Sequence, residues 1–307
     1  MCEENKNLVD NTETVDEYTE NTCIRSPDEL YNYLNSQTKW LIENVEYFKD
    51  FLIAASIIDK SCGELGTDNK LLIYNQNIDA RYLYTKEVWE DMGYQIKEGS
   101  YPILILREIK DKSYKDKSKL QYIVKELYDV LQIDTDYPKE PRFLFSDLGE
   151  AAEGIIRVKP CELTFSVIAA ANRFAYYNSS ENKIAVTNGC KSYDSLFSDI
   201  ACEYAHYEFA RIKTENYLIK AQKEGFEPKE YKYQRKSHLF EAECAAYALS
   251  MMYGVGPGNY DMPQVHQKLF NMSPEEVREE LDLILKAISR IDDRLQNLLT
   301  KEKNMKE

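Results

Sequence analysis

A regular apolar repeat near the C-terminal end is the feature that most constrains how this 307-residue chain can fold. The segment opens with Ser273-Pro-Glu-Glu276, which has the form of a helix capping box with proline at the first helical position. Apolar residues follow at alternating intervals of four and three: Val277, Leu281, Ile284, Ile288, Ile291, Leu295 and Leu298. Such intervals place side chains on one helix face, which Leu285 and Leu299 widen. We predict a helix over 273–300 that packs on its own domain, with self-association as a coiled coil as the alternative.

The composition is that of a globular protein, because 43% of the residues are hydrophobic and 30% are charged. No run approaches 18 uncharged apolar residues, and the first residues lack a basic stretch followed by an apolar one. We therefore expect neither a transmembrane helix nor a signal peptide. The seven cysteines have no framework spacing, which indicates free thiols in a reducing compartment. We expect a cytoplasmic protein.

The formal net charge of −14 argues against non-specific nucleic-acid binding by the whole molecule, because neutralisation of phosphates drives that affinity. An acidic surface supports solubility. An alternative is that it imitates DNA and occupies a nuclease.

The chain divides into four segments. Residues 1–25 are acidic and poor in large apolar side chains, so we expect a disordered tail. Residues 26–133 form a first module, residues 134–141 a proline-containing linker, and residues 142–307 a second domain.

In the first module we predict a helix from the capping box at Ser26, a second helix over 40–59 and a short helix around Trp89. A hairpin turn is expected at 98–100, next to a strand at 102–106. Residues 120–133 begin with helical spacing, but we expect a strand at their end. In the second domain we predict helices over 162–177, about 194–214 and 240–252, and a strand over 183–187.

Cys202-Glu-Tyr-Ala-His206 differs by one residue from His-Glu-x-x-His, the metal-binding helix motif of zincin metallopeptidases. Residues i and i+4 share a helix face and can hold one metal ion, while the glutamate reaches its bound water. A thiolate is also a good zinc ligand, so Cys202 and His206 could bind zinc with Glu203 as general base. The third ligand would be Glu243, Glu241 or His238. The alternative is structural: Cys202 as a small buried hydrophobe and His206 as a hydrogen-bonded core residue.

A basic segment follows the strand at 102–106. Six cations surround an aromatic residue in it: Arg107, Lys110, Lys112, Lys115, Lys117 and Lys119, with Tyr114 among them. A basic loop with an aromatic side chain can track and stack on single-stranded DNA. The alternative is a solvated charged loop, since acids are interspersed.

Residues 40–107 resemble the N-terminal domain of ArdC-type antirestriction proteins and their LtrC-like relatives from conjugative plasmids and transposons. The matching residues are Asn69, Leu71, Leu72, Ile73, Gln76, Asp79, Ala80, Trp89, Gly93, Ile96, Lys97 and Gly99. The resemblance implies a module that binds single-stranded DNA. In the second half, Glu241-Ala-Glu-Cys-Ala-Ala-Tyr247 resembles the second metal helix of the zincin-like domain in the same family.

This resemblance implies an α+β fold of two domains, with single-stranded DNA or a host restriction enzyme as partner and zinc as the cofactor of a working site. The sequence departs from the family at Cys202 and at Leu239, where the family has metal ligands. We therefore expect an accessory protein of a conjugative or other mobile element whose zincin-like domain is inactive. The alternatives are a zinc-dependent hydrolase and an acidic DNA mimic.

Overall fold

The computed structural model describes residues 26–58, 65–108, 122–134, 142–166, 174–187, 192–260 and 266–306. The predicted tail, the linker except Asp134, and the basic segment except Arg107 and Glu108 lie outside these ranges. The boundaries proposed between the two domains therefore stay predictions.

The fold is α+β, as predicted. The helices are α1 (Pro27–Glu43), α2 (Val45–Ile57), α3 (Thr67–Gln76), α4 (Lys86–Asp91), α5 (Leu148–Arg157), α6 (Tyr193–Glu224), α7 (Leu239–Met252), α8 (His266–Leu269) and α9 (Pro274–Lys306). Two 3-10 turns are η2 (Val130–Gln132) and η3 (Arg235–His238). The strands are β1 (Leu83–Tyr84), β2 (Ile103–Glu108), β3 (Tyr122–Asp129), β4 (Glu162–Ser166), β5 (Ala175–Asn178) and β6 (Lys183–Thr187).

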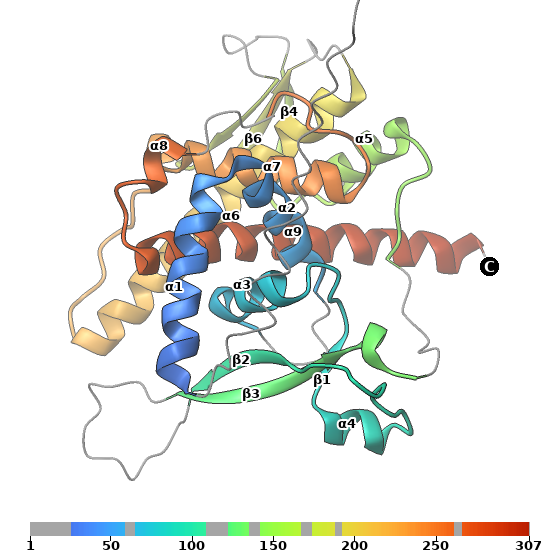
Figure 1. The fold of residues 1–307 in the computed structure, drawn as a ribbon. Helices are drawn as coiled ribbons and strands as arrows, with labels where there is room; N and C mark the ends of the chain where they lie inside the picture. The colour runs from blue at the N-terminus through green and yellow to red at the C-terminus, as the bar shows by residue number, and fades with distance from the viewer. Residues whose placement is uncertain are drawn as a thin grey trace, which may run out of the picture.

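Helix α9 crosses the middle of the molecule, between the β1–β3–β2 sheet and the sheet that contains β4 and β6 (Figure 1). Its capping box is formed as predicted: the Ser273 hydroxyl accepts from the Glu276 amide at 3.2 Å, and the Glu276 carboxylate accepts from the Ser273 amide at 2.7 Å. Val277, Leu281 and Ile284 are fully buried, as are Ile288, Ile291 and Leu295 further along. This apolar face is thus covered by helices of the same chain, from the first module as well as from the second domain, which favours packing within the chain over a coiled coil through this face.

One hydrophobic cluster includes side chains of α1, α2 and α3 together with side chains of α5, α6, α7 and α9. Helix α9 contacts all six of these helices. The two halves of the sequence therefore share an apolar core along α9.

The predicted helix over 40–59 is wrong at its start. The chain breaks at Asn44, which ends α1 and whose side chain accepts from the Tyr47 amide at 3.2 Å to cap α2. Asparagine favours such a cap because its short side chain competes with the backbone for hydrogen bonds.

The first sheet has the order β1–β3–β2, so β2 lies at an edge. Helix α3 covers that edge with two side-chain amides. Asn69 donates to the Leu106 carbonyl at 2.8 Å and accepts from its amide at 2.9 Å, and Gln76 makes the same pair of bonds to Leu104, both at 2.8 Å. An edge strand with free backbone groups is prone to unwanted pairing, so the two amides protect it.

The strand expected at the end of 120–133 is confirmed only in part: β3 already begins at Tyr122 and pairs antiparallel with β2, and it ends at Asp129, before the 3-10 turn η2. The hairpin expected at 98–100 is wrong, because Ile96 forms a bridge with Ile133 instead of pairing with β2. Trp89 is fully buried and donates from Nε1 to the Tyr128 carbonyl at 2.8 Å, which ties α4 to β3.

The helix predicted over 162–177 is also wrong, since its ends form strands β4 and β5. Both pair with β6, the strand predicted over 183–187, β4 in parallel and β5 antiparallel. Strand pairing with β6 overrides the local helical pattern. The helix expected over 194–214 is present but extends to Glu224, and α7 matches the helix expected over 240–252. Among the described helices, none is both long and apolar enough to span a membrane.

We predict that Ile288→Ala lowers the free energy of unfolding by about 2–5 kcal/mol, because it leaves a cavity at the fully buried centre of α9. Urea unfolding followed by circular dichroism measures the change. The matched control on the same helix is Asn297→Ala, at an exposed position, which should change stability by roughly 0.5 kcal/mol or less. Equal effects of the two substitutions would contradict the central role of this face.

Candidate functional site

Helix α6 carries Cys202, Glu203 and His206, and all three are buried. One ligand-type atom from each lies within 4.8 Å of the others. Helix α6 is apolar on more than one face here, as expected of a helix that lies inside the molecule against α5, α7 and α9. The structure thus brings together the three motif residues that the sequence singled out.

The Glu203 carboxylate is held from two sides. Oε1 accepts from Arg235 Nη2 at 2.6 Å, and Oε2 accepts from the backbone amide of Tyr177 in β5 at 2.7 Å. The side chain of Glu203 is 2% exposed and that of Arg235 15% exposed, so the ion pair is largely shielded from water. The guanidinium of Arg235 also lies over the Tyr176 ring, 5.0 Å from its centroid. A general base needs a carboxylate that faces a reacting water, whereas this carboxylate is bound to an arginine.

His206 is engaged by a residue from the same loop as Arg235. Its Nδ1 lies 2.7 Å from the hydroxyl of Tyr233, and the Tyr233 ring stacks on His238 at an interplanar angle of 10°. Residues 231–238, which include η3, therefore contact both Glu203 and His206.

Burial raises the pKa of the Cys202 thiol far above its ordinary value, and the charge of Glu203 raises it further. The thiolate is the form that binds zinc, so metal binding here would have to release the thiol proton. Leu239, at the position where the sequence resemblance places a third ligand, has a side chain without a donor atom. The guanidinium of Arg235 adds a positive charge beside the cluster. This set of donors fits a divalent metal ion poorly.

His238, predicted as a third ligand, lies in a different group. It joins Glu241 of α7 and Glu280 of α9, and one ligand-type atom of each lies within 4.8 Å of the others. Lys268 of α8 makes ion pairs with both carboxylates, at 3.7 Å from Glu280 Oε2 and closer to Glu241. Burial lowers the pKa of the His238 imidazole to about 4, while burial and the neighbouring Glu280 carboxylate raise the pKa of Glu241. Glu243 is partly buried and belongs to neither group, so its role as a ligand stays a prediction.

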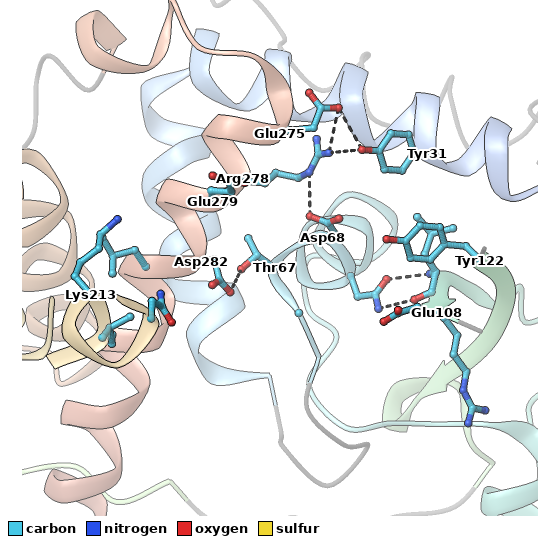
Figure 2. A pocket seen from close by; sticks show the side chains of 17 residues that line it. Tyr31, Thr67, Asp68, Glu108, Tyr122, Lys213, Glu275, Arg278, Glu279 and Asp282 are labelled. Carbon is cyan, nitrogen blue, oxygen red and sulfur yellow. Dashed lines mark hydrogen bonds and ion pairs between the residues drawn. The ribbon is translucent and has the colours of Figure 1, made fainter. Parts of the chain in front are cut away.

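Arg107 lies in β2 with an exposed side chain. It lines a pocket of about 940 Å³ between the first sheet, α6 and the start of α9 (Figure 2). The buried Arg278 crosses one wall, donating to Asp68 at 2.9 Å and to the Tyr31 hydroxyl at 3.3 Å. The pocket lining carries acids as well as cations, which does not favour a phosphate backbone. The other predicted DNA-binding residues, Lys110 to Lys119 with Tyr114, lie outside the described ranges.

Tyr177, Tyr233 and Arg235, which contact the motif, were not predicted from the sequence. Neither were Glu280 and Lys268, the neighbours of Glu241. Arg235 lies 32 positions from Glu203, in a charged stretch that resembles an ordinary solvated loop. No local spacing rule identifies such partners, because the fold alone brings them together.

The site and the fold together define an α+β protein in which a buried helix carries a cluster of metal-type side chains. The ArdC antirestriction protein from plasmid R388 has this fold in its Mn(II)-bound structure. The likeness covers 87% of this chain and 97% of that chain, with a TM-score of 0.51 and 13% sequence identity. The metal-free structure of the same ArdC protein also matches, over 87% of this chain and 98% of that chain, with a TM-score of 0.49 and 15% identity.

No family model and no curated protein matches the sequence. The predicted resemblance to ArdC-type proteins is nevertheless confirmed by the structural likeness, which at this level of identity concerns the fold.

We predict that Arg235→Met lowers the free energy of unfolding by about 2–4 kcal/mol, because it leaves the Glu203 carboxylate buried without its cation. Glu203→Gln in the same chain should recover part of this loss, which a double-mutant cycle by urea unfolding measures. Lys232→Met, at an exposed position in the same loop, is the control and should have little effect. Strictly additive effects of the two site substitutions would show that the pair is not coupled.

The reactivity of the Cys161 thiol, just before β4, is expected to depend on pH. Burial raises the pKa of its thiol to about 11 from an ordinary value of 9.0. Since the thiolate is the nucleophile, alkylation by iodoacetamide at pH 8 should be roughly 100-fold slower in the folded chain than in urea. The folded rate should rise up to about pH 11. Peptide mass spectrometry follows Cys161 separately from the other cysteines, and a folded rate equal to the unfolded rate would contradict the assignment.

Proposed function

We propose that this chain is an antirestriction-type accessory protein of a conjugative or other mobile element, and that it acts by binding rather than by hydrolysis. The observation that carries the proposal is the fold likeness to the Mn(II)-bound ArdC protein, which extends over 87% of this chain and 97% of that one. Because the likeness includes both halves in the same chain, it favours a function of the whole protein over that of one module.

The contacts of Glu203 support the absence of hydrolysis. In the zincin mechanism this glutamate takes a proton from a metal-bound water. In this chain both of its oxygens are bonded, one to Arg235 and one to the Tyr177 amide. Cys202 and Leu239 stand where the resemblance to ArdC-type proteins places two metal ligands, and Leu239 has no donor atom. The zincin-like domain would then serve as a scaffold.

The clustering of Cys202, Glu203 and His206 still favours a zinc hydrolase as the second candidate. That candidate requires near-stoichiometric zinc in the purified protein, lost in Cys202→Ala and in His206→Ala. If zinc is still bound in both variants, or if the unaltered chain binds no zinc, the result favours the scaffold proposal over the hydrolase.

We predict that producing the chain in a restricting recipient cell raises the recovery of incoming unmodified conjugative DNA. Cys202→Ser should retain the effect, because the proposed action does not use a metal on α6. A recipient without the restriction enzyme is the control and should show no change. Recovery that does not rise in the restricting cell would refute the antirestriction proposal.

Two binding assays separate the modes of action. A gel shift with a single-stranded oligonucleotide at low salt tests DNA contact, in which Arg107 is one proposed residue. A cleavage assay tests mimicry: with a net charge of −14, the chain would slow a restriction enzyme without binding DNA itself. The first result favours strand binding and the second favours occupation of the nuclease.

A further inference from the structure

We propose that His238, Glu241 and Glu280 form a binding site for a divalent transition-metal ion, separate from the Cys202 cluster on α6. One ligand-type atom of each residue lies within 4.8 Å of the others, and His238 Nδ1 is 3.9 Å from Glu241 Oε2. The three residues come from η3, α7 and α9, so the tertiary fold assembles the group.

With both carboxyls ionised, three buried atoms of this group have no hydrogen-bond partner among the described residues: His238 Nδ1, Glu241 Oε2 and Glu280 Oε2. A proton on Glu241 can bond the two carboxyls to each other, which still leaves His238 Nδ1 without a hydrogen bond there. Buried polar atoms in folded proteins are nearly always bonded, so this group requires an explanation. All three atoms can accept a cation. Glu241 is completely buried, which makes an uncompensated oxygen there especially costly.

Lys268 provides partners for only part of this group. Its ammonium contacts Glu241 Oε1 and the Ser237 carbonyl, the latter at 3.2 Å, and lies 3.7 Å from Glu280 Oε2. It therefore pairs with the two carboxyl groups and makes no bond to the imidazole. Lys213 of α6 adds charge nearby, through its electrostatic effect on His238 and Glu280.

An imidazole at the same point as two carboxylates distinguishes this group from an ordinary lysine ion pair. A lysine or a shared proton can hold two carboxylates together without any nitrogen ligand. Zinc and manganese, by contrast, readily bind one imidazole together with carboxylates. Ligand atoms around a tetrahedral zinc with bonds of about 2.0–2.2 Å lie roughly 3.3–3.6 Å apart. The distance of 3.9 Å between His238 Nδ1 and Glu241 Oε2 is slightly longer than this range, so these two side chains need only a small movement to reach it.

The site is reachable from solvent on one side. The side chain of Glu280 is 21% exposed and that of Lys268 is 34% exposed, while Glu241 lies at the base of the group. Entry of a metal ion would displace the Lys268 ammonium toward solvent, so this lysine competes with the metal.

Titration calorimetry of the full chain with Zn²⁺ tests the proposal. We expect about one equivalent to bind, with affinity weakened roughly 10-fold or more by His238→Ala and by Glu280→Gln, since each removes a ligand. Lys268→Met should tighten binding, because it removes the competing cation. Cys202→Ser should leave the affinity unchanged. Circular dichroism of each variant shows that it is folded.

The spectrum of bound Co²⁺ gives an independent readout: a site with nitrogen and oxygen ligands lacks the thiolate charge-transfer band that a cysteine ligand produces. Absence of Zn²⁺ binding by both the unaltered chain and Lys268→Met would overturn the proposal. So would binding that is lost in Cys202→Ser and kept in His238→Ala. These results do not depend on the antirestriction assay, so failure of one proposal is distinguishable from failure of the other.

Discussion

Burial of the apolar face of α9 is the constraint on which the rest of the structure depends. The helix contacts α1, α2 and α3 from the first half of the sequence and α5, α6 and α7 from the second. Charged residues of α9 then hold the neighbouring helices in position. Arg278 bonds Asp68 of α3 and Thr38 of α1, while Arg290 and Arg294 bond the completely buried Glu208 of α6. A charge buried without a partner would be strongly destabilising, so these pairs restrict how the two halves can be placed.

Both candidate sites depend on this arrangement. Glu208 lies on the same helix as Glu203 and His206, so its two arginines on α9 help to hold the helix that carries the motif. Glu280, one of the proposed metal ligands, belongs to α9 itself. Residues 231–238 connect the two sites, because Tyr233 bonds His206 and stacks on His238.

Features encoded by neighbouring residues could be predicted from the sequence, and features encoded by distant pairing could not. The capping boxes at Ser26 and Ser273 and the apolar repeat of α9 are local, and all three are present. The segment over 162–177 has a helical pattern, yet β6 recruits its ends into a sheet. The resemblance to ArdC-type proteins identified Asn69 and Gln76, and their role as protection for the edge of β2 became clear only in the structure. Likewise, the motif on α6 was found from its spacing, but Arg235 was not.

Arg235 bears most directly on how the α6 motif should be interpreted. A fully buried carboxylate needs a positive partner, and in a working zincin the metal-bound water meets that need. Here the guanidinium meets it, and the Tyr177 amide satisfies the second oxygen. A histidine at position 202 alone would leave Glu203 bound to Arg235 and Leu239 without a donor atom. Arg235 thus stabilises the buried Glu203 carboxylate, so the environment of the α6 motif depends on residues in contact with it from β5 and from the loop before α7, and not on its spacing alone.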